Sequence, residues 1–250
     1  MTVTLEYADD LSRVKIVADD LGDATDARIE RSVDAVRWTL VRGGAEVPVV
    51  DGVVRLDDYE FTPNRPNHYR VLAEDTTQTA TITPTLRTMW LKSIGKPFLN
   101  VAVTPVGRVT ITRAARNGVF DVIGRSVPVA VTDVRQSRRF SIGLDLQDVA
   151  VRDRVEYLLS TGDPLLLQVP PGSPVPSMYV VVGDTEYDDE MQVGTLPMIE
   201  VAAPSPDIVG STVLWGNIVA QFASWSELVE AEQTWSDVLN IVAEVDVITE

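Results

Sequence analysis

The sequence predicts a mainly β protein with two sandwich-like or barrel-like domains and a short helical C-terminal segment. Apolar residues alternate along several short segments, as Val14 and Ile16 do, which is the pattern of half-buried strands. The clearest hairpin, residues 46–56, turns at an Asp-Gly pair, which favours the positive φ angles of a two-residue type I′ turn. A chain of 250 residues is long enough for two such domains.

Residues 1–85 are predicted to form an immunoglobulin-like or fibronectin-like β-sandwich. One expected strand is the alternating segment Val36, Trp38 and Leu40. A Trp in a middle strand and a Tyr that opens a late strand, here Tyr69, are typical of such sandwiches. A different small β-barrel is the alternative that the same pattern allows.

Residues 86–205 are predicted to form a second β-sandwich or barrel with one packed helix. In the segment 140–146, the side chains of Phe140, Ile142 and Leu144 share one face because side chains alternate along a strand. The candidate strands are residues 99–103, 108–112, 120–123, 127–131, 140–146, 165–169 and 178–182.

The helix of this second domain is expected over residues 149–160. Asp148 can cap its N-terminus, and Gly162 and Pro164 supply the signals that end it. Apolar side chains on one side of the helix are expected to pack on the sheet: Val151, Val155, Leu158 and Leu159.

Residues 206–250 are predicted to be an acidic segment with two short helices, at 225–232 and 235–243. The sequences Ser-Trp-Ser-Glu at 224–227 and Thr-Trp-Ser-Asp at 234–237 each place a hydroxyl three residues before an acid. This spacing is that of a capping box, in which the hydroxyl accepts a hydrogen bond from the backbone at the helix start.

Five residues are candidates for contact with a partner subunit. Trp215, Trp225 and Trp235 either pack on their own domain or anchor the chain on a partner, where large, stiff side chains are favoured. Arg138 and Arg139, together with Arg135, make a small basic patch that we interpret as a subunit contact or a satisfied surface rather than a DNA site.

The charge of the chain is unevenly distributed. The net charge is −16, yet all 21 Lys and Arg lie in residues 1–154, together with 21 of the 37 Asp and Glu. Residues 155–250 hold the other 16 acids and no basic residue. Such a segment cannot neutralise phosphates, so nucleic acid and anionic membranes are poor partners. It is either a solvated acidic surface or the acidic side of a polarised subunit that meets a basic partner.

The composition argues against an enzyme and against a bound cofactor. The chain has no cysteine, which excludes thiolate chemistry. Its one histidine, His68, excludes any site that needs two imidazoles. It contains neither a Walker loop nor a Gly-x-Gly-x-x-Gly loop. Adjacent acids on a strand point to opposite faces, so the Asp pairs do not predict a glycosidase. Calcium binding at 184–190 is the alternative to a solvated turn, although no EF-hand loop is present.

The chain is expected to lack a membrane span and to be synthesised in a cytoplasm. No apolar run approaches the roughly 18–20 residues that cross a bilayer. The N-terminus also lacks the basic, apolar and small-residue order of a secretory signal.

Three stretches together resemble minor tail proteins of long-tailed phages that infect actinobacteria. The first is residues 115–133, with a Gly-Arg-Ser-x-Pro-Val core that leads to Thr-Asp. The second is residues 157–168, Tyr-Leu-Leu-Ser-Thr-Gly-Asp-Pro-Leu-Leu-Leu-Gln, and the third is the Trp-Ser repeat at 225 and 235. The resemblance covers residues 86–245, and none of its motifs is catalytic.

The resemblance implies a distal tail protein, or a related tail-tip component, located in the virion and made in the host bacterial cytoplasm. Such proteins form a homo-oligomeric ring that joins the tail tube to the tip and contacts other tail proteins. The implied role is structural, without a cofactor and without specific nucleic-acid binding. The alternative is a carbohydrate- or receptor-binding module of the virion, because sandwich domains with exposed aromatic residues often bind glycans.

Overall fold

The computed structural model describes residues 1–74, 76–173, 175–204 and 224–231. It is mainly β, as predicted, with several sheets and one long helix. The chain divides into two compact units. Among the described residues, the N-terminal unit comprises residues 1–87 and 92–100 with residues 204 and 224–231, and the second unit comprises residues 88–91 and 101–203.

Two antiparallel sheets form the N-terminal unit. The first has the order β1-β2-β6, and the second the order β4-β3-β7-β8, with β5 paired to β3. Strand β1 lies against β8, which brings the two sheets together as a sandwich. The bounds are β1 Thr2–Ala8, β2 Arg13–Asp19, β3 Asp26–Ser32, β4 Thr39–Leu40, β5 Val47–Pro48, β6 Val54–Asp58, β7 Asn67–Ala73 and β8 Thr76–Ile82.

The core of the N-terminal unit follows the predicted alternation. Val14 and Ile16 on β2 are buried, and the residues that alternate with them along the strand are half-buried. The flanking strands of the predicted hairpin pair elsewhere, β5 with β3 and β6 with β2. Its turn is confirmed: Val50 pairs with Val53 across Asp51 and Gly52, whose φ angles of 52° and 71° are both positive. These are the angles that a type I′ turn requires.

The predicted strand of Val36, Trp38 and Leu40 is wrong. Only Thr39–Leu40 is a strand, Trp38 lies just before it, and Val36 is 77% exposed. The Asp34 carboxylate accepts hydrogen bonds from the backbone N–H groups of Val36 and Arg37. Asp side chains that bond nearby backbone in this way compete with strand pairing, so the segment turns instead.

An eight-stranded sheet and helix α1 (Val149–Ser160) dominate the second unit. The strand order is β10-β9-β15-β16-β18-β14-β11, and β17 pairs with β18. A short 3-10 helix, η1 (Pro97–Leu99), precedes β10, so the strand expected at 99–103 is shorter. The bounds are β9 Met89–Ser93, β10 Val101–Val103, β11 Pro105–Val106, β14 Arg139–Asp145, β15 Leu165–Gln168, β16 Met178–Val182, β17 Glu186–Asp188 and β18 Val193–Glu200.

Two predictions for this unit are confirmed, the buried face of the segment 140–146 and the helix capped by Asp148. Phe140, Ile142 and Leu144 on β14 are buried on one face. Asp148 caps α1, since its carboxylate accepts a 2.9 Å hydrogen bond from the backbone N–H of Ala150. Val155 and Leu158 are the fully buried residues of α1, and Val151 and Leu159 are half-buried.

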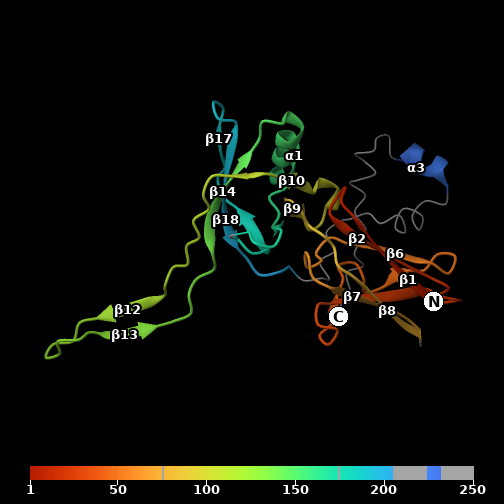
Figure 1. The fold of residues 1–250 in the computed structure, drawn as a ribbon, viewed down its shortest axis with the longest axis horizontal. Helices are drawn as coiled ribbons and strands as arrows, with labels where there is room; N and C mark the ends of the chain where they lie inside the picture. The colour runs from red at the N-terminus through yellow and green to blue at the C-terminus, as the bar shows by residue number, and fades with distance from the viewer. Residues whose placement is uncertain (75, 174, 205–223, 232–250) are drawn as a thin grey trace. The chain divides into compact units, whose positions relative to one another are not determined.

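The predicted strands at 108–112, 120–123 and 127–131 are not part of the main sheet. The first is not a strand, apart from a single bridge between Thr112 and Arg139. The strand expected at 120–123 shares only Phe120 with β12 (Asn117–Phe120), and the one expected at 127–131 overlaps β13 (Val129–Thr132). Among the described strands, β12 and β13 pair only with each other. Figure 1 shows them at the end of a long ribbon that projects from the eight-stranded sheet.

Helix α3 (Trp225–Ala231) corresponds to the first predicted C-terminal helix. Its cap is the predicted one, because the backbone N–H of Glu227 donates to the Ser224 hydroxyl. The second predicted helix, at 235–243, lies outside the described residues. Among the helices in the described ranges, none is long and apolar enough to cross a membrane.

Replacing Leu144 by Ala is expected to lower the free energy of unfolding by about 2–5 kcal/mol, because Leu144 is fully buried on β14. Tyr157→Ala on the exposed side of α1 is the matched control and is expected to change it by less than about 0.5 kcal/mol. Urea unfolding followed by circular dichroism measures both. Equal losses in the two variants would contradict the assigned core.

Candidate functional site

The main candidate site is a projecting two-stranded ribbon, residues 107–139, here called the arm. The chain leaves the sheet after β11 and returns to it at β14. Along the arm the two sides stay hydrogen-bonded: Thr112 and Arg139 exchange two backbone hydrogen bonds, and the N–H of Asp133 donates to the carbonyl of Arg116. At about 3.3 Å per residue, such a ribbon reaches about 50 Å from its base to its tip.

No residue of the arm is buried. Nevertheless it carries large apolar side chains, with Phe120 57% exposed and Ile123 at the tip fully exposed. The other large apolar residues exposed on the arm are Ile111, Val119, Val122, Val127, Val129, Val131 and Val134. A concentration of exposed apolar residues on one element marks an interaction surface.

One face of the arm is built around Phe120. The register places Phe120 opposite Val129 and Gly118 opposite Val131, so these four residues share a face. A Cβ at Gly118 would lie 2.7 Å from the Phe120 ring, so the ring occupies the space that the glycine leaves. The result is an exposed apolar face made of Phe120, Val129 and Val131.

The arm is also basic. It contains two acids, Asp121 and Asp133, and seven arginines: Arg108, Arg113, Arg116, Arg125, Arg135, Arg138 and Arg139. Two of these arginines contact Glu200 on β18, and the other five make no ion pair with any described residue. The arm therefore presents positive charge around its apolar face.

The structure places the predicted contact residues Arg138 and Arg139 at the base of the arm. The Arg138 guanidinium donates to the Glu200 carboxylate at 2.8 Å, and the Arg138 backbone N–H donates to the same carboxylate at 2.9 Å. Arg139 is exposed and pairs through its backbone with Ile199. Arg138 thus anchors the arm to the sheet, and its role in a subunit contact stays a prediction.

The predicted tryptophan anchors are not brought together in the described part of the chain. Trp225 opens α3 and is 60% exposed. Trp215 and Trp235 lie outside the described residues. Their role as partner contacts stays a prediction as well.

A second exposed feature of the same unit has the opposite charge. Residues 183–192, here called the acidic hairpin, include β17 and the turn that leads into β18. Every residue in it is exposed. It carries five acids, Asp184, Glu186, Asp188, Asp189 and Glu190, with the exposed apolar side chains of Tyr187 and Met191 between and beside them.

The acidic hairpin is held by its own backbone and by α1. The Asp188 carboxylate accepts a 2.9 Å hydrogen bond from the backbone N–H of Met191, which shapes the turn. The Arg152 guanidinium on α1 lies 6.0 Å from the centre of the Tyr187 ring. In the described ranges, this hairpin included, no group of three or more His, Asp or Glu side chains is arranged to hold a metal ion.

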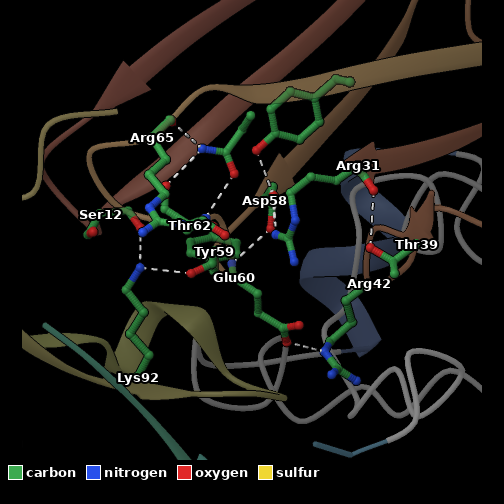
Figure 2. Close-up of polar contacts among 12 residues, drawn as sticks. Ser12, Arg31, Thr39, Arg42, Asp58, Tyr59, Glu60, Thr62, Arg65 and Lys92 are labelled. Carbon is green, nitrogen blue, oxygen red and sulfur yellow. Dashed lines mark hydrogen bonds and ion pairs between the residues drawn. The ribbon is translucent and has the colours of Figure 1, made fainter. Parts of the chain in front are cut away.

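A buried polar cluster in the N-terminal unit is the second candidate (Figure 2). The Lys92 amine is 1% exposed and donates to the backbone carbonyls of Ser12, at 2.5 Å, and Tyr59, at 2.8 Å. Burial lowers the pKa of Lys92 to about 7, although the nearby Asp58 and Glu60 carboxylates oppose the shift. Lysines with lowered pKa values serve as nucleophiles in some enzymes.

The geometry of this cluster indicates a structural role for Lys92. Its amine is enclosed and satisfies two buried carbonyls, one of them on Ser12, whose φ angle of 51° is positive. Nearby, the buried Asp58 carboxylate accepts hydrogen bonds from Arg31, from the Tyr69 hydroxyl at 2.7 Å, and from the backbone of Glu60. These bonds tie β3, β6 and β7 together.

Sequence reasoning missed both the arm and the Lys92 cluster. A signal for the arm was present, because seven arginines and three glycines lie among its valines, an unusual pattern for a core. The Lys92 cluster had no sequence signal, since its partners Ser12 and Tyr59 lie 80 and 33 residues away in the chain.

No family model matches the chain, and a search of curated proteins found no relative.

The Lys92 cluster predicts a distinct pH dependence of stability. Unfolded Lys92 keeps its proton up to its ordinary pKa of 10.5, whereas the folded protein releases it near 7. Between these values the unfolded state binds more protons, so the free energy of unfolding should rise with pH, by up to about 1.4 kcal/mol per unit. The window is pH 7.5–9.5, because above it the raised pKa values of Tyr7 and Tyr59, about 12 each, make stability fall.

Urea unfolding across this window should show the rise in the wild type and in Lys15→Met, which changes a partly exposed lysine. The rise should be absent in Lys92→Met. If Lys92→Met keeps the same slope as Lys15→Met, Lys92 is not the group that titrates.

Proposed function

We propose that this chain is a structural protein of a phage virion, a distal tail or tail-tip component that acts through contacts with copies of itself and with other tail proteins. The observation that carries the proposal is the arm. An isolated two-stranded hairpin is marginally stable in water, because it has no core to bury its side chains. An arm that exposes Phe120, Ile123 and several valines is therefore an element made to be covered by another molecule.

The family resemblance supports the same role. Its first stretch, residues 115–133, coincides with β12, the tip and β13, which are the outer part of the arm. Its second stretch, residues 157–168, covers the end of α1 and β15. The proposal therefore combines an exposed element with a sequence resemblance that falls on the same residues.

The proposed action is mechanical and involves neither catalysis nor a cofactor. Subunits that each lend an arm to a neighbour form a closed ring when the rotation between copies closes, and an open filament when it does not. A ring of this kind can surround a passage for DNA without binding specific sequences. The N-terminal unit is then free to contact tip or fibre proteins.

The test of this function compares the full chain with an armless variant, in which Asn-Gly replaces residues 114–137 between Arg113 and Arg138. Asn-Gly forms the two-residue turn that suits a hairpin. The thermal midpoint should be unchanged, because no replaced residue is buried. Mass photometry should show multiples of the 27.4 kDa chain for the wild type and single chains for the variant.

Two outcomes would contradict the proposal. One is a wild-type chain that stays monomeric at its highest soluble concentration. The other is a purified particle from the encoding genome that antibodies against the chain fail to label in immunogold electron microscopy. A monomer that binds cell-wall polysaccharide would favour a glycan-binding module.

A further inference from the structure

We propose that the arm of one copy docks on the acidic hairpin (residues 183–192) of a second copy, in a head-to-tail contact. This inference rests on the proposed function and names the surface that receives the arm. It follows from three properties of the two elements: their charges, their exposed apolar residues and their free strand edges.

The charges of the two elements are complementary. The arm has seven arginines against two acids, and the acidic hairpin has five acids and no basic residue. On the arm, Arg116 and Arg125 are exposed and make no ion pair with the described residues. On the hairpin, Asp189 and Glu190 are exposed. Complementary charges of this kind speed association and set the register of a contact.

Both elements also carry apolar residues within the charged surface. Phe120, Val129 and Val131 form one face of the arm, and the register places Arg116 at the end of that same face. Tyr187 and Met191 are exposed on the acidic hairpin. A contact in which apolar side chains meet inside a rim of opposite charges has the usual anatomy of a protein interface.

The strand edges fit the same contact. Strand β17 pairs with β18 on one side, and no described strand pairs with its other side. In the described part of the chain, β12 and β13 likewise pair only with each other. An unpaired edge can accept a strand from another chain, which adds backbone hydrogen bonds to the side-chain contacts.

The two elements leave the eight-stranded sheet in different directions, as Figure 1 shows. The arm continues from β11 and β14, whereas the hairpin extends from β18. A contact between the arm of one copy and the hairpin of the next therefore uses two different surfaces of the chain. Such a contact is heterologous, which is the type that builds rings and filaments.

Charge reversal tests the contact. The arm variant is Arg116→Glu with Arg125→Glu, and the hairpin variant is Asp189→Lys with Glu190→Lys. Each variant alone is expected to raise the dissociation constant of self-association roughly tenfold or more, because two attractive pairs become repulsive. Sedimentation velocity in low-salt buffer measures the constant, and added salt should weaken the wild-type contact.

Mixing the two variants is the decisive step. In an equimolar mixture, the acidic arm of one variant meets the basic hairpin of the other, and the remaining arm and hairpin keep their native charges. Association is expected to return to within about threefold of the wild type, a difference below 1 kcal/mol. A chain that carries all four changes should associate in the same way.

Controls with the same change of charge lie in the N-terminal unit. Arg37→Glu with Arg65→Glu matches the arm variant, and Asp23→Lys with Glu46→Lys matches the hairpin variant, all at exposed positions. These controls should associate like the wild type. Unchanged thermal midpoints would show that all variants fold.

Several outcomes would overturn the inference. If the hairpin variant associates like the wild type, or if the mixture fails to associate, the arm binds another surface. If the wild type shifts the mobility of duplex DNA in a gel and the arm variant does not, the arm binds nucleic acid instead. A monomeric wild type contradicts the proposed function as well. An oligomer whose association does not change in the hairpin variant contradicts only this inference.

Discussion

The central constraint on this protein is that a two-stranded ribbon cannot bury its own side chains. Every residue of the arm lies on a surface, yet the arm carries Phe120, Ile123 and a series of valines. In the sheet from which the arm projects, the equivalent apolar residues of β14 are covered within the unit. The same alternating pattern therefore builds a core in one place and an exposed apolar face in the other. The difference lies in how many strands stand side by side.

The N-terminal unit is distinguished by charged groups in its interior. Arg31 and Asp58 pair with each other, and Tyr69 completes the hydrogen bonding of the carboxylate. The buried Lys92 amine donates hydrogen bonds to the backbone carbonyls of Ser12 and Tyr59. Buried ion pairs add little net stability, since desolvation offsets the attraction between the charges. Their hydrogen bonds nevertheless join specific positions on β3, β6 and β7, which favours one arrangement of these strands.

Sequence periodicity predicted the elements that depend on local residues. The Asp51-Gly52 turn, the Asp148 cap and the alternation on β14 all follow from neighbours within a few positions, and the structure contains each of them. The prediction of a strand around Val36 was wrong because the Asp34 carboxylate accepts hydrogen bonds from the backbone there. Alternation alone did not predict the arm, since it indicates a strand without saying whether another strand covers it. The Lys92 cluster depends on chain segments that meet only in the folded protein.

One consequence of the arm concerns how the sequence can change over generations. The arm is joined to the rest of its unit by its two strands and by the contacts of Arg113 and Arg138 with Glu200. Because no residue between Gly107 and Arg139 contributes to the interior, substitutions there leave the folding of the sheet intact. The arm can therefore diverge, lengthen or be exchanged by recombination while the framework persists. If the arm docks on a partner as proposed, the matching surface of that partner limits this freedom, so the two surfaces must evolve together.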